Sequence, residues 1–322
     1  DKVNIHDVGE KNGGRLSRMT VTVSKIYKKA IDLNSAVYHL HDPELLPVAR
    51  KLRNLGKVVI FDAHEDLPKQ ILGKPYLNKF SKLILSKFFA FYERFVCKEL
   101  DAVITATPVI RDKFSSFSRL SIDINNYPFL DELHSNNCWE SKSTEICYIG
   151  GIDANRGIRE VVDALSKVKN IRLNLAGKFS EKSLEKEMKL TTGWDNVNFH
   201  GQVERKDLVN ILSRSMAGLV TFLELPNHVD AQPNKMFEYM SAGLPVIGSD
   251  FPLWREIIVG YDCGVCVDPS DARAIANAYE VLVSDHKRAM EMGQNGRRAI
   301  ETKYNWNKEE VKLLELYRRL TA

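Results

Sequence analysis

The stretch "QPNKMFEYMSAGLPVIGSD", residues 232–250, is predicted to form one helix that leads directly into one buried strand. The helix begins at the polar letters PNK, and the strand is the apolar segment "LPVIGS" at 244–249. A helix followed by a short, fully apolar strand is typical of parallel βαβ units. The stretch raises two questions: whether the rest of the chain repeats this pattern, and what the polar helix start and its lone acid, Glu238, bind.

Strand-like segments recur along the chain, and the apolar residues between most of them have helical spacing. The segments are "VYHLH" (37–41), "KVVIFDAH" (57–64), "DAVITAT" (101–107), "RLSIDINN" (119–126), "EICYIGG" (145–151), "IRLNLAG" (171–177), "NVNFHG" (196–201), "AGLVTF" (217–222) and "GVCVD" (264–268). Fully buried parallel strands need helices on both faces of their sheet. Residues 131–144 are polar and unpatterned, and we interpret them as a linker between two domains.

We therefore predict an α/β protein with two doubly wound, Rossmann-like domains that face each other across a cleft. The predicted domains span residues 1–140 and 141–303, and a helix at 304–322 is predicted to pack back toward the first domain. Ligands of such sheets bind beyond the carboxyl ends of the strands. The polar residues that follow each strand are therefore the candidates for a site.

The composition limits the classes of protein to consider. Hydrophobic residues make up 44% and charged residues 27%, as in ordinary globular domains. The formal charge of +4 suits a phosphate-bearing ligand or an anionic membrane surface but requires neither. No apolar run approaches the roughly 18 residues of a membrane span, and no signal peptide opens the chain. The five cysteines form no disulfide-like pattern, so we expect a cytoplasmic location. We also expect no nucleic-acid partner.

The segment "YIGGIDANRGIREVV" is the first candidate binding loop. The predicted strand ends at Gly150 and Gly151, which let the backbone approach a ligand closely. A helix is predicted to begin near Gly157, and Arg156 stands at its mouth, where free N–H groups attract anions. A forked arginine at this point suits a diphosphate. The alternative is a plain turn with a surface arginine, because the segment matches no established phosphate-loop motif.

The polar helix start in the opening stretch is the second candidate. A proline in a first helical turn leaves the amides of Asn234, Lys235 and Met236 as unpaired donors, and Lys235 adds a full charge. Glu238 lies one turn further on and suits a ribose diol, while Asp230 precedes the helix and could contact a donated sugar. The alternative is that Glu238 caps its own helix start and Asp230 is an ordinary loop residue.

The opening stretch resembles the signature region of family-4 retaining glycosyltransferases of the GT-B fold. That signature has two acids separated by seven residues, followed by A-x-G-x-P-V-I. Further ordered landmarks resemble the family: "YIGGIDANRGIREVVDAL", "LNLAGK", "NVNFHGQVERKDLVNILSRSMAGLVTF" and "YNWNKEEVKLLELYRRL". The resemblance covers residues 145–322. Upstream, "YHLHDPELLPVARKL", "VVIFDAHEDLP" and "ITATPVIRDKF…NNYP" resemble the bacterial subgroup that makes surface polysaccharides such as O-antigen, capsule and exopolysaccharide.

The resemblance implies a role for each residue of the signature. Glu238 would hold the ribose, and Asp230 would touch the transferred sugar, although the family usually has the longer glutamate there. Asn234 and Lys235 would present amides to the distal phosphate. Arg156 stands where the family places a basic ligand of the diphosphate, so Arg156 and Lys235 would stabilise the leaving group.

The donor-binding half has three further implied contacts. Gly150 and Gly151 would let the donor approach the backbone, but the family's second basic residue is absent, because Ile152 follows. Lys178 would replace that charge or lie beside the base. Val203 would offer its backbone to the edge of the nucleobase.

In the acceptor-side domain the resemblance implies a catalytic histidine. His64 in "DAHED" follows a predicted strand and matches a cleft histidine that contacts the donor sugar. Glu65 lies next to it. His41 and Asp42 follow the preceding strand and are expected to line the same cleft, unless Asp42 only caps the helix that begins after it.

Residues 68–100 carry a basic, aromatic-rich pattern that includes Phe80, Phe88 and Phe91. A helix of this kind can lie in a membrane interface, and we consider peripheral contact with the inner face of the plasma membrane. The alternative is a core helix with a solvated lysine face.

The resulting hypothesis is a retaining, metal-independent glycosyltransferase of cell-surface polysaccharide synthesis. It would use no cofactor and would move a sugar from a UDP- or GDP-linked donor to a saccharide or a polyprenyl-diphosphate-linked acceptor. The first strand-like piece is "KVNIHDV", near Gly13 and Gly14, so the family's first two βα units, roughly 50 residues, appear missing. Two alternatives therefore stay open: a nucleotide-sugar-binding module without turnover, and a sugar-nucleotide epimerase.

Overall fold

The computed structural model describes residues 3–9, 14, 17–74, 76–130, 132–133, 139 and 142–322. It divides into two compact units, Asp1–Asn125 with Lys312–Ala322, and Asn126–Val311. Each unit has a parallel sheet with helices packed on it, so the predicted α/β class with two Rossmann-like domains is confirmed. The domain limits expected from the sequence stay predictions.

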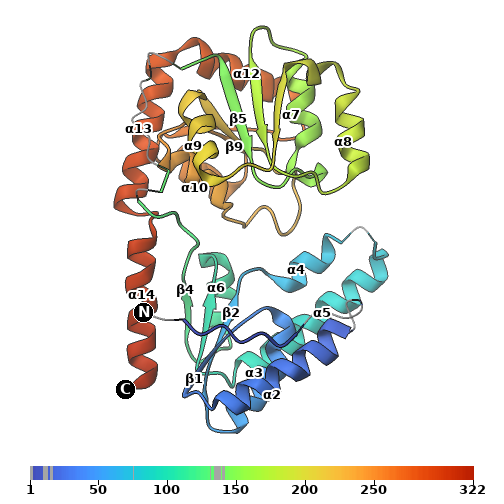
Figure 1. Cartoon of the computed structure of the whole chain (residues 1–322), viewed down its shortest axis with the longest axis vertical. Coiled ribbons are helices and arrows are strands. Elements are labelled where there is room, and N and C mark those ends of the chain that lie inside the picture. Colours follow the sequence, from blue (N-terminus) through green and yellow to red (C-terminus); the bar gives the residue numbers. More distant parts are fainter. Residues whose placement is uncertain are drawn as a thin grey trace. The chain divides into compact units, whose positions relative to one another are not determined.

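The first unit has a four-stranded parallel sheet in the order β1-β2-β3-β4 (Figure 1). Its strands are β1 (Val37–His41), β2 (Val58–Ala63), β3 (Ala102–Thr105) and β4 (Ser121–Asp123). Its helices are η1 (Arg18–Thr22), α2 (Val23–Leu33), η2 (Pro43–Leu45), α3 (Leu46–Asn54), α4 (Leu67–Leu72), α5 (Lys79–Cys97) and α6 (Pro108–Ser115). The apolar side chains of the sheet, α3 and α6 form one core with the end of α5.

The second unit has a six-stranded parallel sheet in the order β10-β9-β8-β5-β6-β7. Its strands are β5 (Glu145–Ile149), β6 (Arg172–Ala176), β7 (Val197–Gly201), β8 (Ala217–Val220), β9 (Val246–Ser249) and β10 (Gly264–Val267). Its helices are η4 (Ala154–Arg156), α7 (Ile158–Leu165), α8 (Lys182–Lys189), η5 (Thr192–Asn196), α9 (Arg205–Arg214), α10 (Asn234–Ser241), α11 (Pro252–Ile258), α12 (Ala272–Ser284) and α13 (His286–Thr302). The last helix, α14 (Trp306–Thr321), belongs to the second unit up to Val311 and to the first from Lys312.

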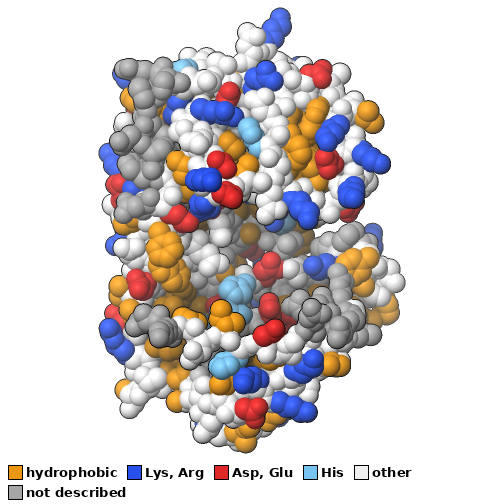
Figure 2. Space-filling view, in the orientation of Figure 1, with side chains coloured by type: hydrophobic (Ala, Val, Ile, Leu, Met, Phe, Trp, Pro, Cys, Tyr) orange, Lys and Arg blue, Asp and Glu red, His pale blue; other side chains and the backbone are white. Residues whose placement is uncertain are grey.

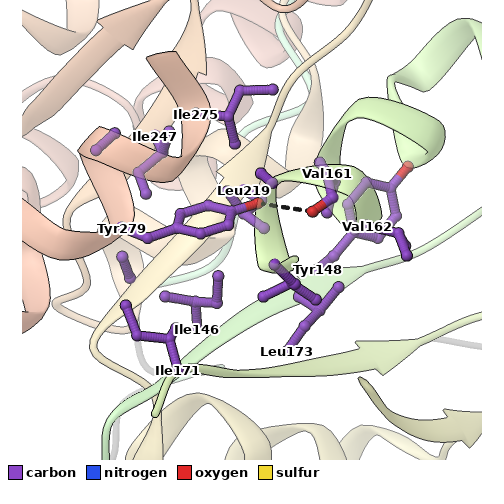
Figure 3. Packing of buried hydrophobic residues seen from close by; sticks show 14 of the residues in the cluster. Ile146, Tyr148, Val161, Val162, Ile171, Leu173, Leu219, Ile247, Ile275 and Tyr279 are labelled. Carbon is purple, nitrogen blue, oxygen red and sulfur yellow. Dashed lines mark hydrogen bonds between the residues drawn. The ribbon is translucent and has the colours of Figure 1, made fainter. Parts of the chain in front are cut away.

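Both faces of the second sheet are buried, as its apolar strands require. Alternate residues of β5 point to opposite faces: Ile146 and Tyr148 belong to one core, and Cys147 and Ile149 to the other. Helices α7 and α12 cover the first face, whose core is drawn in Figure 3. There the hydroxyl of Tyr279 donates to the carbonyl of Val161 at 3.3 Å, so this deeply buried polar atom is satisfied.

One expectation about the chain's organisation needs correction. Residues 3–9, which include most of the strand-like "KVNIHDV", form no strand, while Lys2 and Gly13 lie outside the described residues. Among the described residues of the expected linker, Leu133 packs into the core of the second unit, and the ammonium of Lys142 donates to the carbonyls of Ser213 and Ser215 at 2.9 and 2.6 Å. The hydrogen bonds from Lys142 satisfy carbonyl groups at the C-terminal end of α9, and the polar sequence of this segment does not predict them.

In the described part of the chain, no helix has both the length and the apolarity that crossing a bilayer needs.

Candidate functional site

The strand order of the second sheet reverses between β5 and β8. From β5 the chain continues to β6 and β7 on one side, and it then returns to β8 and continues to β9 and β10 on the other. Sheets of this kind bind ligands at the reversal, beyond the carboxyl ends of the strands. Gly150 and Gly151 follow β5 and Thr221 follows β8, so these three residues lie at that point.

The loop after β5 requires glycine at two positions. Gly150 has φ of 98°, in the left-handed region that residues with a side chain rarely adopt. Gly157 has φ of 75°, and a Cβ there would lie 2.1 Å from the carbonyl oxygen of Thr221. The backbone of this loop is therefore bare and lies close to the end of β8.

Arg156 lies between these glycines, one residue before the N-terminal cap of α7, as the sequence predicts. Its guanidinium donates to the carbonyl of Gly151 at 3.2 Å and lies 5.3 Å from the ring centre of Phe222. Both contacts position the guanidinium beside the glycine loop, where its remaining N–H groups can donate to a ligand.

Lys235, the second residue of α10, is buried, with only 7% of its surface exposed. Its Nζ lies 3.8 Å from the ring centre of Tyr148 and 3.7 Å from the point that a Cβ on Gly150 would occupy. Among the described residues, Nζ has no hydrogen-bond partner. Burial lowers the pKa of Lys235 well below its usual range, and the charge of Arg156 lowers it further. An anion beside the ammonium would oppose both effects and raise the pKa again, so the full charge that the sequence predicts here stays a prediction.

The start of α10 differs in one detail from the prediction. Pro233 is the N-terminal cap, and no side chain caps the helix, so the alternative in which Glu238 does so is wrong. The amide of Met236 donates to the carbonyl of Pro233 at 3.0 Å and is not free, because the first turn closes on itself. The amides of Asn234 and Lys235 precede the helical ladder and keep their donor capacity by helix geometry.

Thr221 adds a further donor at the same place. Its side chain is buried, and within the described part of the chain its Oγ1 has no hydrogen-bond partner. We call Gly150, Gly151, Arg156, Thr221 and Lys235 the anion seat. Two cationic side chains and an unsatisfied hydroxyl beside a bare backbone loop can bind phosphate oxygens through charge-assisted hydrogen bonds.

Glu238 faces a pocket of about 350 Å³ that Asn234 also lines. Its Oε1 accepts a hydrogen bond from Arg205 at 2.8 Å, and the other arm of Arg205 pairs with Glu132 at 2.9 Å. Arg205 therefore fixes one carboxylate oxygen of Glu238 and leaves the other for a hydroxyl donor. Figure 2 shows acidic and basic side chains side by side on this face of the second unit.

The remaining donor-side candidates surround these groups less closely. Asp230 is half-buried in the turn before α10. Lys178 is exposed just after β6, and its carbonyl accepts from the amide of Ile152 at 3.0 Å, which ties it to the glycine loop. Val203 is half-buried after β7 and packs against the core. Their implied contacts with sugar and base stay predictions.

The first unit has a pocket of about 320 Å³, and most of the site residues predicted for this unit line it. Asp42, His64 and Glu65 all line it, and Glu93 lies at its wall. Asp42 has φ of 71° and makes no side-chain cap to the following helix, so the capping alternative is wrong. Burial raises the pKa of Glu93, whose carboxylate pairs with Lys113 at 2.7 Å.

His41 lies directly beside this pocket, because its Nδ1 is 3.0 Å from Nε2 of His64. The two rings stack with centres 5.3 Å apart. Burial lowers the pKa of His41, the nearby charge of Asp62 opposes this, and His39 and His64 lower it again. The structure thus brings His41, Asp42, His64 and Glu65 together, as expected.

More than half of the chain, residues 131–299 of 322, matches the family described as "Glycosyl transferases group 1". The chain belongs to this family. The matched segment contains the anion seat and Glu238 with its partners Glu132 and Arg205.

One curated relative and several solved structures resemble this group 1 glycosyltransferase. Capsular polysaccharide biosynthesis glycosyltransferase CapM of Staphylococcus aureus is 25% identical over 170 residues, which are 50% of this chain and 42% of CapM. The matched part thus spans less than half the length of CapM.

Solved structures agree with the fold. Sucrose-phosphate synthase from Thermosynechococcus elongatus has a TM-score of 0.77 at 21% identity over 96% of this chain and 80% of its own. Anabaena Alr3699/HepE in complex with UDP-glucose has a TM-score of 0.74 at 13% identity. The match covers 95% of this chain and 84% of HepE. S. aureus TarM, in a complex with Fondaparinux, alpha-GlcNAc-glycerol and UDP, has a TM-score of 0.71 at 16% identity. The match covers 92% of this chain and 58% of the TarM chain. The three structures support a GT-B glycosyltransferase fold.

Sequence reasoning missed five residues of these two regions of the glycosyltransferase: His39, Asp62, Glu132, Arg205 and Thr221. Three of them carry a visible signal. Asp62 is a lone acid in an apolar strand, His39 precedes His41 by two residues, and Thr221 directly ends a strand. The salt bridges from Arg205 to Glu132 and Glu238 join distant segments, and no local pattern predicts them.

Proposed function

We propose that this group 1 glycosyltransferase transfers a sugar from a UDP- or GDP-linked donor to a saccharide or lipid-linked acceptor with retention of configuration. The observation that carries the proposal is the buried ammonium of Lys235, which has no partner among the described residues and lies beside Gly150. A buried amine without a counter-charge is costly unless a ligand supplies one. Diphosphate supplies that charge where it is needed.

The residues would share the work of catalysis. Arg156, Lys235 and the amides at the start of α10 would stabilise the charge that develops on the leaving diphosphate. Glu238 would accept hydrogen bonds from the ribose hydroxyls through its second oxygen. Asp230 and His64 would contact the transferred sugar. Because two fixed cations already face the phosphates, we propose that this step needs no metal ion.

The acceptor is proposed from similarity and chemistry together. CapM carries a name from capsular polysaccharide biosynthesis, and TarM was solved with a saccharide and a GlcNAc-glycerol. We propose a role in cell-surface polysaccharide synthesis, with a saccharide or a polyprenyl-diphosphate-linked glycan as acceptor. From the family resemblance we also propose that Val203 offers its backbone to the edge of the nucleobase and that Lys178 either supplies the second basic charge or lies beside the base.

Calorimetric titration with UDP and GDP tests the donor site. We expect Arg156→Ala to weaken binding of the preferred nucleotide by about 2 kcal/mol, roughly thirtyfold, because a charge-assisted hydrogen bond is lost. Arg159→Ala is the matched control, since this exposed arginine pairs with Glu187 at 2.6 Å on the protein surface. If neither nucleotide binds, or if both variants bind alike, the proposed donor site is wrong.

Two further measurements address the chemistry. Donor affinity should be the same in EDTA and in Mg²⁺, and a requirement for Mg²⁺ would contradict the metal-independent assignment. Transfer from a labelled nucleotide-sugar, with the anomer of the product read by NMR, separates a retaining transferase from an inverting one. Binding without any transfer would favour a nucleotide-sugar-binding module.

Helix α5 supports a second proposal, peripheral binding to an anionic membrane. Phe80, Ile84, Phe88 and Phe91 recur at spacings of four, four and three and are 74%, 50%, 57% and 70% exposed. They therefore form one apolar stripe on the helix surface. Lysines 79, 82 and 87 lie on the same helix. Hydrophobic side chains reach the surface near α4 and α5 (Figure 2).

The core alternative for α5 is wrong for this stripe, because only the last turns of the helix are buried. Exposed aromatic residues among lysines match the chemistry of an interface with anionic lipids. We propose that the chain binds the inner face of the plasma membrane through this stripe.

Sedimentation with vesicles of phosphatidylglycerol and phosphatidylcholine tests the membrane proposal. We expect wild type to co-sediment and Phe88→Ser/Phe91→Ser to stay in the supernatant. Leu190→Ser is the control, because Leu190 is 88% exposed on the other unit. Equal sedimentation of all three proteins would refute a role for α5, whatever the donor titrations show.

A further inference from the structure

The ends of β1 and β2 bring together three atoms of the kinds that bind metal ions. His39 Nε2, His41 Nδ1 and Asp62 Oδ2 all lie within 4.8 Å of one another. The two histidines are two residues apart on β1, so they point to the same face of the strand. His41 is paired in register with Asp62 on β2, which places the carboxylate next to them.

The distances between these atoms fit one ion. Asp62 Oδ2 lies 3.4 Å from His39 Nε2 and 3.3 Å from His41 Nδ1. In a tetrahedral zinc site with bonds of about 2.0–2.1 Å, neighbouring ligand atoms are roughly 3.3–3.4 Å apart. The two separations from Asp62 therefore match shared coordination, and the two histidine nitrogens lie within 4.8 Å of each other.

His39 is oriented as metal-binding histidines are. Its Nδ1 lies 2.7 Å from the hydroxyl of Tyr317, a contact that fixes the ring. Its Nε2 is buried and forms no hydrogen bond within the described part of the chain, although the carboxylate of Asp62 is close. A simple ion pair would point an N–H at that carboxylate. Because Nε2 forms no such hydrogen bond, its lone pair is available to an ion in the same space.

We propose that His39, His41 and Asp62 bind a divalent transition-metal ion, with Zn²⁺ as the best match. Imidazole nitrogens suit zinc, whereas magnesium and calcium prefer oxygen ligands alone. Nε2 of His64 lies 3.0 Å from Nδ1 of His41 and is in reach of the fourth position. The site shares no residue with the anion seat and does not depend on the proposed function.

Metal uptake by the untagged 322-residue chain tests this proposal. The protein is stripped with EDTA, dialysed and titrated with ZnCl₂ in a calorimeter, and bound zinc is counted by plasma mass spectrometry. We expect one ion per chain, and Co²⁺ in its place should give the visible absorption of a four-coordinate site.

Variants identify the ligands. His41→Ala and Asp62→Asn should abolish stoichiometric uptake, and Tyr317→Phe should weaken it roughly 10–100-fold, because it removes only the group that orients His39. His286→Ala, an exposed histidine on α13, is the matched control and should bind zinc as wild type does.

Melting curves without metal distinguish a variant that no longer folds from one that folds but no longer binds zinc. His41 is 54% exposed, so its truncation should leave the fold intact. Zinc should raise the melting temperature of wild type and of His286→Ala but not of His41→Ala. The proposal is overturned if wild type takes up no zinc, or if folded His41→Ala and Asp62→Asn bind it like wild type.

Discussion

Helices α10 and α5 depart from ordinary burial preferences in opposite directions. Helix α10 carries a lysine that is only 7% exposed and has no hydrogen-bond partner in the described chain, whereas α5 carries phenylalanines that are up to 74% exposed. Each arrangement costs free energy in an isolated chain, since buried amines and exposed aromatic rings are both unfavourable. The two helices thus have different proposed partners: a diphosphate for α10 and a membrane surface for α5.

The comparison also explains which partner each helix can accept. Lys235 lies between the ring of Tyr148 and the bare backbone of Gly150, a position that suits a small anion such as a phosphate group. The stripe on α5 is long and open, so it suits an extended surface. Variants that remove one feature at a time separate the two roles.

The largest effect is expected for Lys235→Met. Donor nucleotide should bind more weakly by about 2–5 kcal/mol, because the variant loses a desolvated charge contact. The same variant should be more stable without nucleotide by about 1–3 kcal/mol, since an unpaired buried amine is removed. Calorimetry and urea denaturation measure the two quantities. A loss of both affinity and stability would mean that Lys235 is simply a structural residue.

Glu238→Ala should have the next largest effect on the donor. We expect affinity for the preferred nucleotide to fall by about 1.5–3 kcal/mol, because the ribose loses a charged acceptor. The deoxyribose form of the nucleotide should then bind the variant as well as the ribose form does. Glu132→Ala is the control: it leaves Glu238 and its salt bridge to Arg205 in place. Equal losses in the two variants would indicate that the pocket has only been destabilised.

The affinity for UDP should depend on pH through Lys235. Burial and Arg156 lower the pKa of Lys235 in the free protein, and a bound diphosphate raises it again. Between these two values binding takes up a proton, so affinity falls as pH rises, by at most about tenfold per pH unit. Calorimetric titrations between pH 7 and 9 in buffers of different ionisation enthalpy measure how many protons are taken up when UDP binds. The dependence should vanish in Lys235→Met, and its persistence would assign it to another group.

The smallest effect is expected for the stability of the α5 variant. Phe88→Ser/Phe91→Ser should change the free energy of unfolding by no more than about 0.5 kcal/mol per site, because both rings are already exposed to solvent. A loss of several kcal/mol would mean that the stripe packs against the protein and is unavailable to a membrane.

The sequence predicted the strands well and the details of the site less well. Short apolar runs such as "EICYIGG" locate strands because their burial on both faces leaves no polar alternation. Arg156 is predicted because it directly precedes a helix start after a strand, and Glu238 because it is a lone acid one turn into a helix. The burial of Lys235 was not predicted, since it depends on Tyr148 and on the missing side chain of Gly150, which only the folded sheet brings together.

Pairings across the chain were equally hidden. Arg205 meets Glu132 and Glu238 only after three separate segments have folded, and Asp62 meets His41 only through the register of β1 and β2. The first turn of α10 closed on Pro233 rather than leaving Met236 free, a choice of local geometry that the residue types do not determine.

The reversal of strand order between β5 and β8 has a consequence for folding. Gly150 follows the first strand of this sheet in sequence, while Lys235 follows β8, so β6 and β7 lie between the two residues along the chain. Contacts between such distant segments form late, because closing a long loop is entropically costly. We therefore expect the proposed nucleotide binding to appear late in refolding, and the appearance of UDP affinity would time the pairing of β5 with β8.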